Sequence, residues 1–238
     1  MIKINPDLNR SALATEFRDA GWVQVSNFLT ESSANALLDL LDTQTPWGLA
    51  WQAGGTGPQY VSAGQLKEMS PQQHADRRAK LLQTRSTSAA YNYAYRSYSL
   101  SEPTHRRVLD DLNGGAFIDL LRTLTGDDGI ILVDGQATLF APGNAIAVHT
   151  DEVADEGRRV AYVLNLTKGE WRPEWGGYLN FFDANGNIER GLRPRFNTLN
   201  IFSVPRWHSV APVAPEAPIA RYAVTGWGRS KETAPKIL

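Results

Sequence analysis

The chain has 238 residues, of which 42% are hydrophobic and 21% are charged, and its formal net charge is −1. This composition is ordinary for a soluble globular protein, and the balanced charge gives no basic surface for nucleic acid. Because the chain has no cysteine, disulfides, thiolate metal sites and cysteine nucleophiles are excluded. No apolar run approaches the roughly 20 residues of a membrane span, and the N-terminus lacks a signal-peptide core, so we expect a cytoplasmic protein without a membrane partner.

The first hundred residues are predicted to be mostly helical, with helix starts marked by capping residues. Asn9 or Ser11 is in position to cap a first helix, and Thr30 is in position to cap a second. Residues 70–73 have the capping-box pattern, with serine at the cap, proline at the first helical position and glutamine three residues after the cap. Apolar residues at helical spacing predict further helices within residues 108–124. We expect these helices to cover one face of a sheet.

Two aromatic segments of the N-terminal half are candidates for substrate binding. Residues 46–58 are rich in glycine and contain two tryptophans, so we predict a loop of the kind that forms lids or binding sites. Tyrosines alternate from Tyr91 to Tyr95, as on a strand, and their hydroxyls need partners if they are buried. In the alternative interpretation these rings belong to the core. The candidate substrate residues are Trp47, Trp51, Tyr93 and Tyr95.

From Gly129 onward the pattern changes to short β-type runs separated by glycine, proline, asparagine and aspartate. About eight such runs at this spacing predict a sandwich, barrel or jelly roll, so the chain is mainly β with flanking helices, of the α+β class. No repeat or linker divides it. We therefore expect a single domain over residues 1–238, with a helix-rich flank carrying the substrate loop over 1–128 and a β core over 129–229. The expected strands are 22–25, 130–133, 138–141, 145–148, 160–166, 178–182, 198–202, 209–213 and 222–227.

Four histidines are the candidate nitrogen ligands for a metal. His74 and His105 lie in or beside charged helices and are expected to be solvated. His149 and Asp151 are two residues apart and would point to the same face of a strand, while His208 lies in a second apolar run. Two histidines and one carboxylate form the facial triad that suits non-haem Fe(II). The alternative is that both apolar-run histidines are hydrogen-bonded core residues.

Two downstream features favour the metal-ligand interpretation. Gly176 and Gly177 open a strand, where paired glycines permit close backbone approach. Arg221 begins an otherwise apolar strand, and its guanidinium matches a carboxylate through two parallel hydrogen bonds. The anion is either a bound ligand or an Asp or Glu side chain. Arg158 and Arg159 are interpreted as residues of a solvated turn, with steering of an acidic substrate as the alternative.

Taken in order, these motifs resemble the double-stranded β-helix core of the Fe(II)- and 2-oxoglutarate-dependent dioxygenases, most closely the prolyl-4-hydroxylase-like branch. The resemblance covers about 95 residues, from 135 to 229, and extends more loosely to the N-terminal loop and tyrosine strand. The matching series is His149-Thr150-Asp151, Tyr162-Val163-Leu164-Asn165, Gly176-Gly177-Tyr178-Leu179, Phe196-Asn197-Thr198-Leu199, Phe202, His208-Ser209-Val210 and Arg221-Tyr222-Ala223-Val224-Thr225-Gly226-Trp227.

The resemblance implies a jelly-roll, cupin-like core with the N-terminal helices packed on one sheet, and it implies roles for the site residues. His149, Asp151 and His208 would be the catalytic ligands of Fe(II), and Arg221 would pair with the distal carboxylate of 2-oxoglutarate. Leu179, Thr225 and Trp227 would lie near this cosubstrate.

One departure from the family concerns the second contact to the cosubstrate carboxylate. Many relatives have a tyrosine that assists the arginine, but Leu139-Phe140 and Val163 stand at the matching places here. The nearest hydroxyl is that of Tyr162, which we include as a candidate cosubstrate residue. The strand pleat would point Tyr162 and Val163 to opposite faces, which argues against this contact.

The implied reaction is hydroxylation by O2, with 2-oxoglutarate converted to succinate and CO2 and with ascorbate as an accessory reductant. The branch favours a prolyl residue of a protein or peptide as the substrate; free proline or another small molecule is the alternative. Two rivals come from other classes. A non-enzymatic cupin-like barrel would bind a ligand with structural histidines, and a zinc hydrolase would leave Arg221 without a role, although Glu152 lies beside its metal ligands. The sequence does not indicate an oligomeric state.

Overall fold

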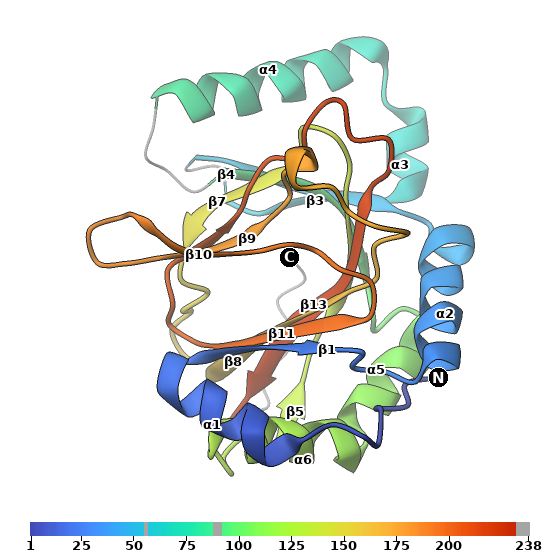
Figure 1. The fold of residues 1–238 in the computed structure, drawn as a ribbon. Coiled ribbons are helices and arrows are strands. Elements are labelled where there is room, and N and C mark those ends of the chain that lie inside the picture. The colour runs from blue at the N-terminus through green and yellow to red at the C-terminus, as the bar shows by residue number, and fades with distance from the viewer. Residues whose placement is uncertain (55–56, 88–91, 232–238) are drawn as a thin grey trace.

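The computed structural model describes residues 1–54, 57–87 and 92–231 (Figure 1). A π-helical turn, Leu40–Gln44, extends α2, and a 3-10 turn spans Pro173–Trp175. The helices are α1 (Arg10–Ala20), α2 (Glu31–Asp39), α3 (Ala63–Glu68), α4 (Pro71–Thr87), α5 (Arg106–Asn113) and α6 (Gly115–Thr125). The strands are β1 (Trp22–Ser26), β2 (Gly48–Ala53), β3 (Gln59–Val61), β4 (Asn92–Ser99), β5 (Leu132–Val133), β6 (Gln136–Phe140), β7 (Ala145–His149), β8 (Arg158–Asn165), β9 (Leu179–Phe182), β10 (Ile188–Leu192), β11 (Thr198–Ser203), β12 (His208–Val210) and β13 (Arg221–Arg229).

The strands form one strongly curled antiparallel sheet in the order β1-β11-β8-β13-β6-β4-β7-β12-β9-β10 (Figure 1). The sheet bends at strand β4, because the C-terminal part of β4 pairs with β6 and its N-terminal part pairs with β7. The half that contains β8 and β13 therefore faces the half that contains β7, β12 and β9. This is the predicted jelly roll, and the strands expected beyond residue 129 are all present.

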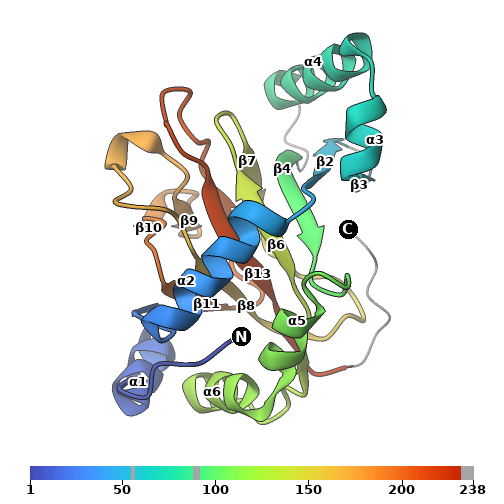
Figure 2. The ribbon, with the colours of Figure 1, turned by 90° about the vertical axis from the view of Figure 1, so that its right-hand side faces the viewer.

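Helices α1, α2, α5 and α6 lie on the outer face of the larger half of the sheet (Figure 2). Apolar side chains such as Phe17, Leu37 and Phe117 pack there against Leu164 of β8 and Leu199 of β11 in one buried cluster. This confirms that N-terminal helices cover one face of a sheet. The capping-box helix α4 differs, because it lies with α3 beside β2 and β4 at the other end of the molecule (Figure 2).

The predicted capping hydrogen bonds form at α1 and α4, whereas Thr30 occupies the N-cap position of α2 without a side-chain hydrogen bond. The Asn9 side chain accepts a hydrogen bond from the backbone of Ala12 at the start of α1. At α4, the Ser70 hydroxyl accepts from the Gln73 amide, and the Gln73 side chain accepts from the Ser70 amide. In the part of the chain that the structure describes, no helix is long and apolar enough to cross a membrane.

The prediction of a loop over residues 46–58 is wrong for residues 48–53. Residues Gly48–Ala53 form β2, which pairs with β3 on one side and with β4 on the other. A Cβ at Gly48 would lie 2.7 Å from the carbonyl oxygen of Val61, so this glycine permits close strand pairing rather than a turn. Residues 55–56, and Tyr91 at the start of the tyrosine strand, lie outside the described residues.

The expectation that His105 is solvated is also wrong. Its side chain is 0% exposed, its ring packs edge-on against Tyr98, and its Nε2 lies 3.0 Å from the Thr45 hydroxyl. Burial lowers the pKa of His105 to about 4. His74 on α4 is half-buried, with its Nδ1 3.2 Å from the Arg77 guanidinium.

Candidate metal and cosubstrate site

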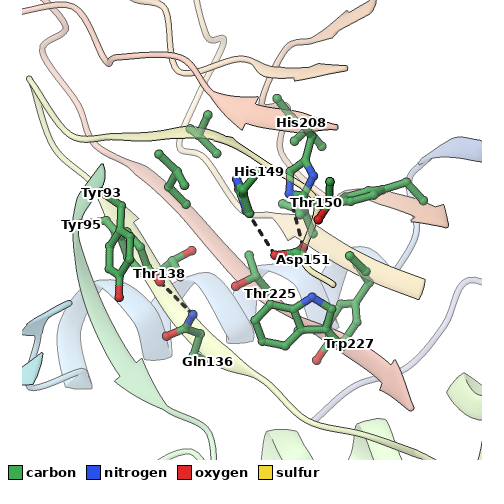
Figure 3. A pocket seen from close by; sticks show the side chains of 18 of the residues that line it. Tyr93, Tyr95, Gln136, Thr138, His149, Thr150, Asp151, His208, Thr225 and Trp227 are labelled. Atoms are coloured by element: carbon green, nitrogen blue, oxygen red, sulfur yellow. Dashed lines mark hydrogen bonds and ion pairs between the residues drawn. The ribbon is translucent and has the colours of Figure 1, made fainter. Parts of the chain in front are cut away.

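A cavity of about 360 Å³ lies between the two halves of the curled sheet (Figure 3). Its walls are formed by side chains from β4, β6, β7, β8, β9, β12 and β13, together with the turn that follows β7. Residues that are far apart in the sequence therefore meet in one cavity, as expected for a jelly roll that binds its ligand between its sheets.

His149, Asp151 and His208 converge in this cavity (Figure 3). His149 ends β7 and lies directly opposite His208, which begins the antiparallel strand β12. The Asp151 carboxylate lies between them, with Oδ1 3.2 Å from His149 Nε2 and Oδ2 3.3 Å from His208 Nε2. The three predicted ligands are thus brought together, each with one ligand atom within 4.8 Å of the others.

The hydrogen bonds of the two imidazoles fix which nitrogen faces Asp151. Nδ1 of His149 lies 2.8 Å from the Ala147 carbonyl, and Nδ1 of His208 lies 2.8 Å from the Arg206 carbonyl. A carbonyl oxygen only accepts, so each Nδ1 carries a proton and, in the neutral ring, each Nε2 presents its lone pair toward Asp151. Two imidazole lone pairs and a carboxylate at this spacing fit a bound cation, and backbone-anchored Nδ1 atoms are the usual support of metal-binding histidines.

The Asp151 carboxylate is held in its charged form. Burial by itself would raise its pKa, but the contacts with His149 and His208 outweigh burial and keep the pKa well below its usual range. The backbone of Asp151 is left-handed, with φ of 63°, and this turns the side chain back between the histidines. A non-glycine residue rarely adopts such a conformation unless its surroundings hold it there.

Arg221 lies in the same cavity as an uncompensated buried cation. Its side chain is 2% exposed, and among the described residues it makes no salt bridge. Nε and Nη2 each donate to the Asn165 side-chain oxygen at 3.3 Å, whereas Nη1 has no hydrogen-bond partner in the described structure. Burial lowers the Arg221 pKa to about 10, so the group is still charged at neutral pH. A buried cation with a free donor fits a carboxylate ligand, and no Asp or Glu of the described ranges pairs with it.

The cavity face of β13 carries the other residues predicted from the Arg221 strand. Thr225 and Trp227 follow Arg221 at even spacing and line the cavity with it, as the strand pleat requires. Leu179 lines the opposite wall from β9. Its strand follows Gly176, where a Cβ would lie 2.2 Å from the Pro212 carbonyl, so Gly176 does permit close backbone approach, whereas Gly177 faces side chains.

Tyr162 does not reach the arginine. Its hydroxyl donates to the Asp134 carbonyl at 2.8 Å, and its ring packs edge-on against Phe117 in the helix-covered core. The strand pleat thus points it away from Val163, and we withdraw Tyr162 as a cosubstrate contact. Phe140 lies beside the guanidinium instead, with its ring centroid 5.2 Å from Arg221 Cζ.

The candidate substrate residues divide into two pairs. Tyr93 and Tyr95 line the cavity from β4, and Tyr95 stacks on Phe140 with 5.0 Å between ring centroids (Figure 3). Trp47 packs against Tyr222 in the core, and Trp51 is not among the described residues that line the cavity. The neighbouring β2 residue, Gln52, lines it instead.

Sequence reasoning gave no site role to Asn165 and Gln136, and it favoured a solvated turn for Arg158, which lines the cavity. Asn165 holds Arg221, and the Gln136 amide donates to the Tyr95 hydroxyl at 3.1 Å. Asn165 belongs to the Tyr-Val-Leu-Asn motif that resembles the family, so the sequence did mark it as a residue of interest. Nothing in that motif indicates that its partner is an arginine.

Fold and geometry together define a class of protein: a jelly roll that encloses a two-histidine, one-carboxylate metal site beside a buried cation free to bind a carboxylate. Comparisons with known proteins agree. Residues 135–229 match the 2OG-Fe(II) oxygenase superfamily. The β core thus matches a 2OG-Fe(II) oxygenase domain and the fold is like that of prolyl 4-hydroxylases, which together support a dioxygenase enzyme and disfavour the non-enzymatic barrel.

Solved structures resemble the chain over nearly its whole length. A prolyl-4-hydroxylase from Pseudomonas putida aligns with a TM-score of 0.60 and 19% identity, covering 94% of this chain and 100% of the other. A 2OG-Fe(II) oxygenase family oxidoreductase from Burkholderia pseudomallei gives a TM-score of 0.64 and 13% identity, covering 98% and 95%. A Trichoplax adhaerens prolyl hydroxylase in complex with a hypoxia inducible factor peptide fragment gives 0.52 and 15%, covering 93% and 89%. No curated protein sequence matches the chain significantly.

Proposed function

We propose that this dioxygenase hydroxylates a prolyl residue of a protein or peptide, with 2-oxoglutarate converted to succinate and CO2. The observation that carries the cosubstrate assignment is the free Nη1 of the buried Arg221, in the same cavity as the triad. His149, Asp151 and His208 would hold Fe(II), and Arg221 would bind the distal carboxylate of 2-oxoglutarate. Bound iron and cosubstrate would supply the oxidising chemistry with O2, which no protein side chain provides.

The residues of the chain orient and enclose the reacting groups. The two Nδ1 hydrogen bonds fix the imidazole rings, and Asn165 fixes the guanidinium through Nε and Nη2, which leaves Nη1 to pair with a ligand. Leu179 and Val163 give this part of the cavity an apolar lining that excludes water and strengthens the charge pairing.

The aromatic wall supports a prolyl substrate. Tyr93, Tyr95 and Trp227 line the cavity around the triad and offer flat apolar surfaces to a pyrrolidine ring (Figure 3). A structural neighbour was solved with a peptide fragment bound, and we extend this kind of substrate to the present chain.

We also propose that residues 1–238 act as one oxygenase domain. Side chains of the helical flank, including Phe17 and Phe117, share a buried cluster with Val160 and Leu199 of the β core. Neither part covers its apolar surface without the other.

The test is a turnover assay with anaerobically loaded Fe(II), 2-oxoglutarate and O2, with and without ascorbate. A set of proline-containing peptides is compared with matched peptides in which alanine replaces proline, and with free L-proline. We expect succinate release that depends on a prolyl peptide, together with a 16 Da gain on its proline. Turnover of free proline without turnover of any peptide would contradict the peptide assignment, and an absence of any metal-dependent succinate would contradict the cosubstrate assignment.

A further inference from the structure

Arg158 begins β8 and makes three kinds of contact around Asp151. Its Nη1 donates to the Asp151 carbonyl at 3.1 Å. Its Nε and Nη2 bind one oxygen of Glu156 at 3.0 and 2.8 Å. Its Cζ lies 3.6 Å from the centroid of the Trp227 ring, so the guanidinium covers the indole that lines the cosubstrate cavity.

The burial of Arg158 sets it apart from its neighbour. The Arg158 side chain is 8% exposed and lines the cavity, whereas the Arg159 side chain is 53% exposed and pairs with Asp127 at 3.3 Å. Both arginines lie in β8 and not in the expected turn; the expectation of solvation fits Arg159 and is wrong for Arg158. Two adjacent arginines thus provide one buried residue at the site and one matched surface residue.

Asp151 needs support from outside its own turn. It lies beyond the end of β7 in a left-handed conformation, and its carboxylate contacts are with the two histidines that would share a metal with it. The Arg158 hydrogen bond holds the backbone of Asp151 instead, and so fixes the direction of the side chain without competing for its oxygens.

An arginine suits this position because its fork is planar and rigid. One face of the guanidinium stacks on Trp227, while the N–H groups at its edge donate to Asp151 and Glu156. A lysine ammonium cannot make all three contacts. Trp227 is itself anchored, since its amide donates to Asp134 at 3.0 Å and Asp134 pairs with Arg229 at 2.8 Å. The guanidinium therefore ties the Asp151 turn to a fixed wall of the cavity.

We propose that Arg158 is a positioning residue that holds Asp151 in its metal-binding conformation by bracing it against Trp227 and Glu156. This inference rests on the proposed role of Asp151 as a metal ligand. Arg158 acts through the backbone of Asp151 and does not itself touch the metal.

The experiment measures Mn²⁺ affinity without turnover, from the electron paramagnetic resonance signal of the free ion. Because groups that orient metal ligands typically contribute 10- to 100-fold to affinity, we expect Arg158→Gln to weaken Mn²⁺ binding by about this factor. Arg158→Lys keeps the charge and one donor, so its affinity should lie between those of Arg158→Gln and wild type. The matched control Arg159→Gln should stay within about twofold of wild type, since exposed ion pairs contribute little.

Melting temperatures measured without metal separate positioning from folding. A loss of Mn²⁺ affinity with an unchanged melting temperature supports positioning. Should Arg158→Gln fail to fold, Arg158→Lys decides, with an affinity equal to wild type counting against the proposal. Wild-type affinity in a folded Arg158→Gln protein overturns the proposal and leaves the proposed function intact. If the wild type itself binds no Mn²⁺, both are overturned.

Discussion

At the scale of single residues, Asp151 is the group on which the proposed metal binding depends most directly. It supplies the negative charge of the triad, and its low pKa keeps it ionised across the neutral range. We expect Asp151→Asn to weaken Fe(II) binding by at least about 100-fold, because the amide neither carries the charge nor offers two acceptor oxygens. Anaerobic titration with Fe(II) and 2-oxoglutarate, followed by the visible absorption of the chelate, measures this loss.

The control for Asp151 is its neighbour Glu152, which lines the cavity but lies outside the triad. Glu152→Gln should retain the metal and the absorption band. A loss of turnover specific to Glu152→Gln, with Fe(II) and 2-oxoglutarate still bound, would favour acid–base chemistry of the hydrolase type over the oxygenase mechanism.

Arg221 is a residue whose removal should have opposite effects on binding and on stability. Its charge is buried without an anionic partner in the described structure, so Arg221→Met removes a desolvation cost and leaves no anion behind. We expect the apo-protein to unfold at the same or a higher urea concentration. Affinity for 2-oxoglutarate should fall by about 30-fold or more, equivalent to the roughly 2–5 kcal/mol lost when one partner of a buried charge pair is removed.

Urea titration measures the stability of the apo-protein, and isothermal calorimetry with Mn²⁺ present measures the affinity for 2-oxoglutarate. A variant that loses about 3 kcal/mol of stability instead would mean that Arg221 is a structural cation with a protein partner.

At the scale of elements, His105 makes the start of α5 sensitive to pH. Its folded pKa is about 4, below the roughly 6.5 of an unfolded histidine, because burial disfavours the charged ring. The N-terminus of a helix also disfavours a cation. The folded state therefore binds the proton more weakly, and stability present above pH 6.5 is lost as the pH falls toward 4. The loss amounts to at most about 3 kcal/mol.

Urea unfolding between pH 4.5 and 7.5 tests this with His105→Gln, which should flatten the pH dependence by up to about 1.4 kcal/mol per pH unit. His74→Gln is the control, because it shows how much the loss of a different histidine changes the pH dependence of the unfolding free energy. An unchanged slope in His105→Gln would mean that the ring is not buried in solution.

Elements were predictable where their signals are local. Capping residues and apolar periodicity predicted α1, α2 and α4, and short β-type runs predicted the core strands. These predictions succeed because the residues that an element buries recur at a fixed spacing in its own sequence. Strand β2 was missed because its stability comes from pairing with β3 and β4, which no local pattern records. His105 was misjudged for a related reason, since its burial arises from Thr45 and Tyr98, far away in the sequence or on another element.

At the scale of the whole molecule, the proposed metal and cosubstrate ligands could be predicted from the sequence, whereas the residues that hold those ligands in place could not. The order of His149, Asp151, His208 and Arg221 along the chain resembles a known family and so could be read directly. The contacts of Asn165 with Arg221 and of Arg158 with Trp227 arise only when the sheet curls and brings β8 beside β13. Trp47 and Trp51 were substrate candidates from their local sequence, but neither is among the described residues that line the cavity, because their surroundings are set by tertiary contacts such as Trp47 with Tyr222.

Because both halves of the sheet line the cavity, ligand binding should stabilise the molecule as one unit. A ligand present at about 100 times its dissociation constant adds about 2.7 kcal/mol to the unfolding free energy. For domains of this size, each kcal/mol of added unfolding free energy typically raises the melting temperature by about 2–4 °C. We therefore expect 2-oxoglutarate with Mn²⁺ to raise the single melting transition by about 5–11 °C above that with Mn²⁺ alone. Arg221→Met should keep the Mn²⁺ effect and lose the increment from 2-oxoglutarate. Two separate transitions, with only one responding to ligand, would mean that the helical flank and the β core unfold independently, against the shared apolar cluster that joins them.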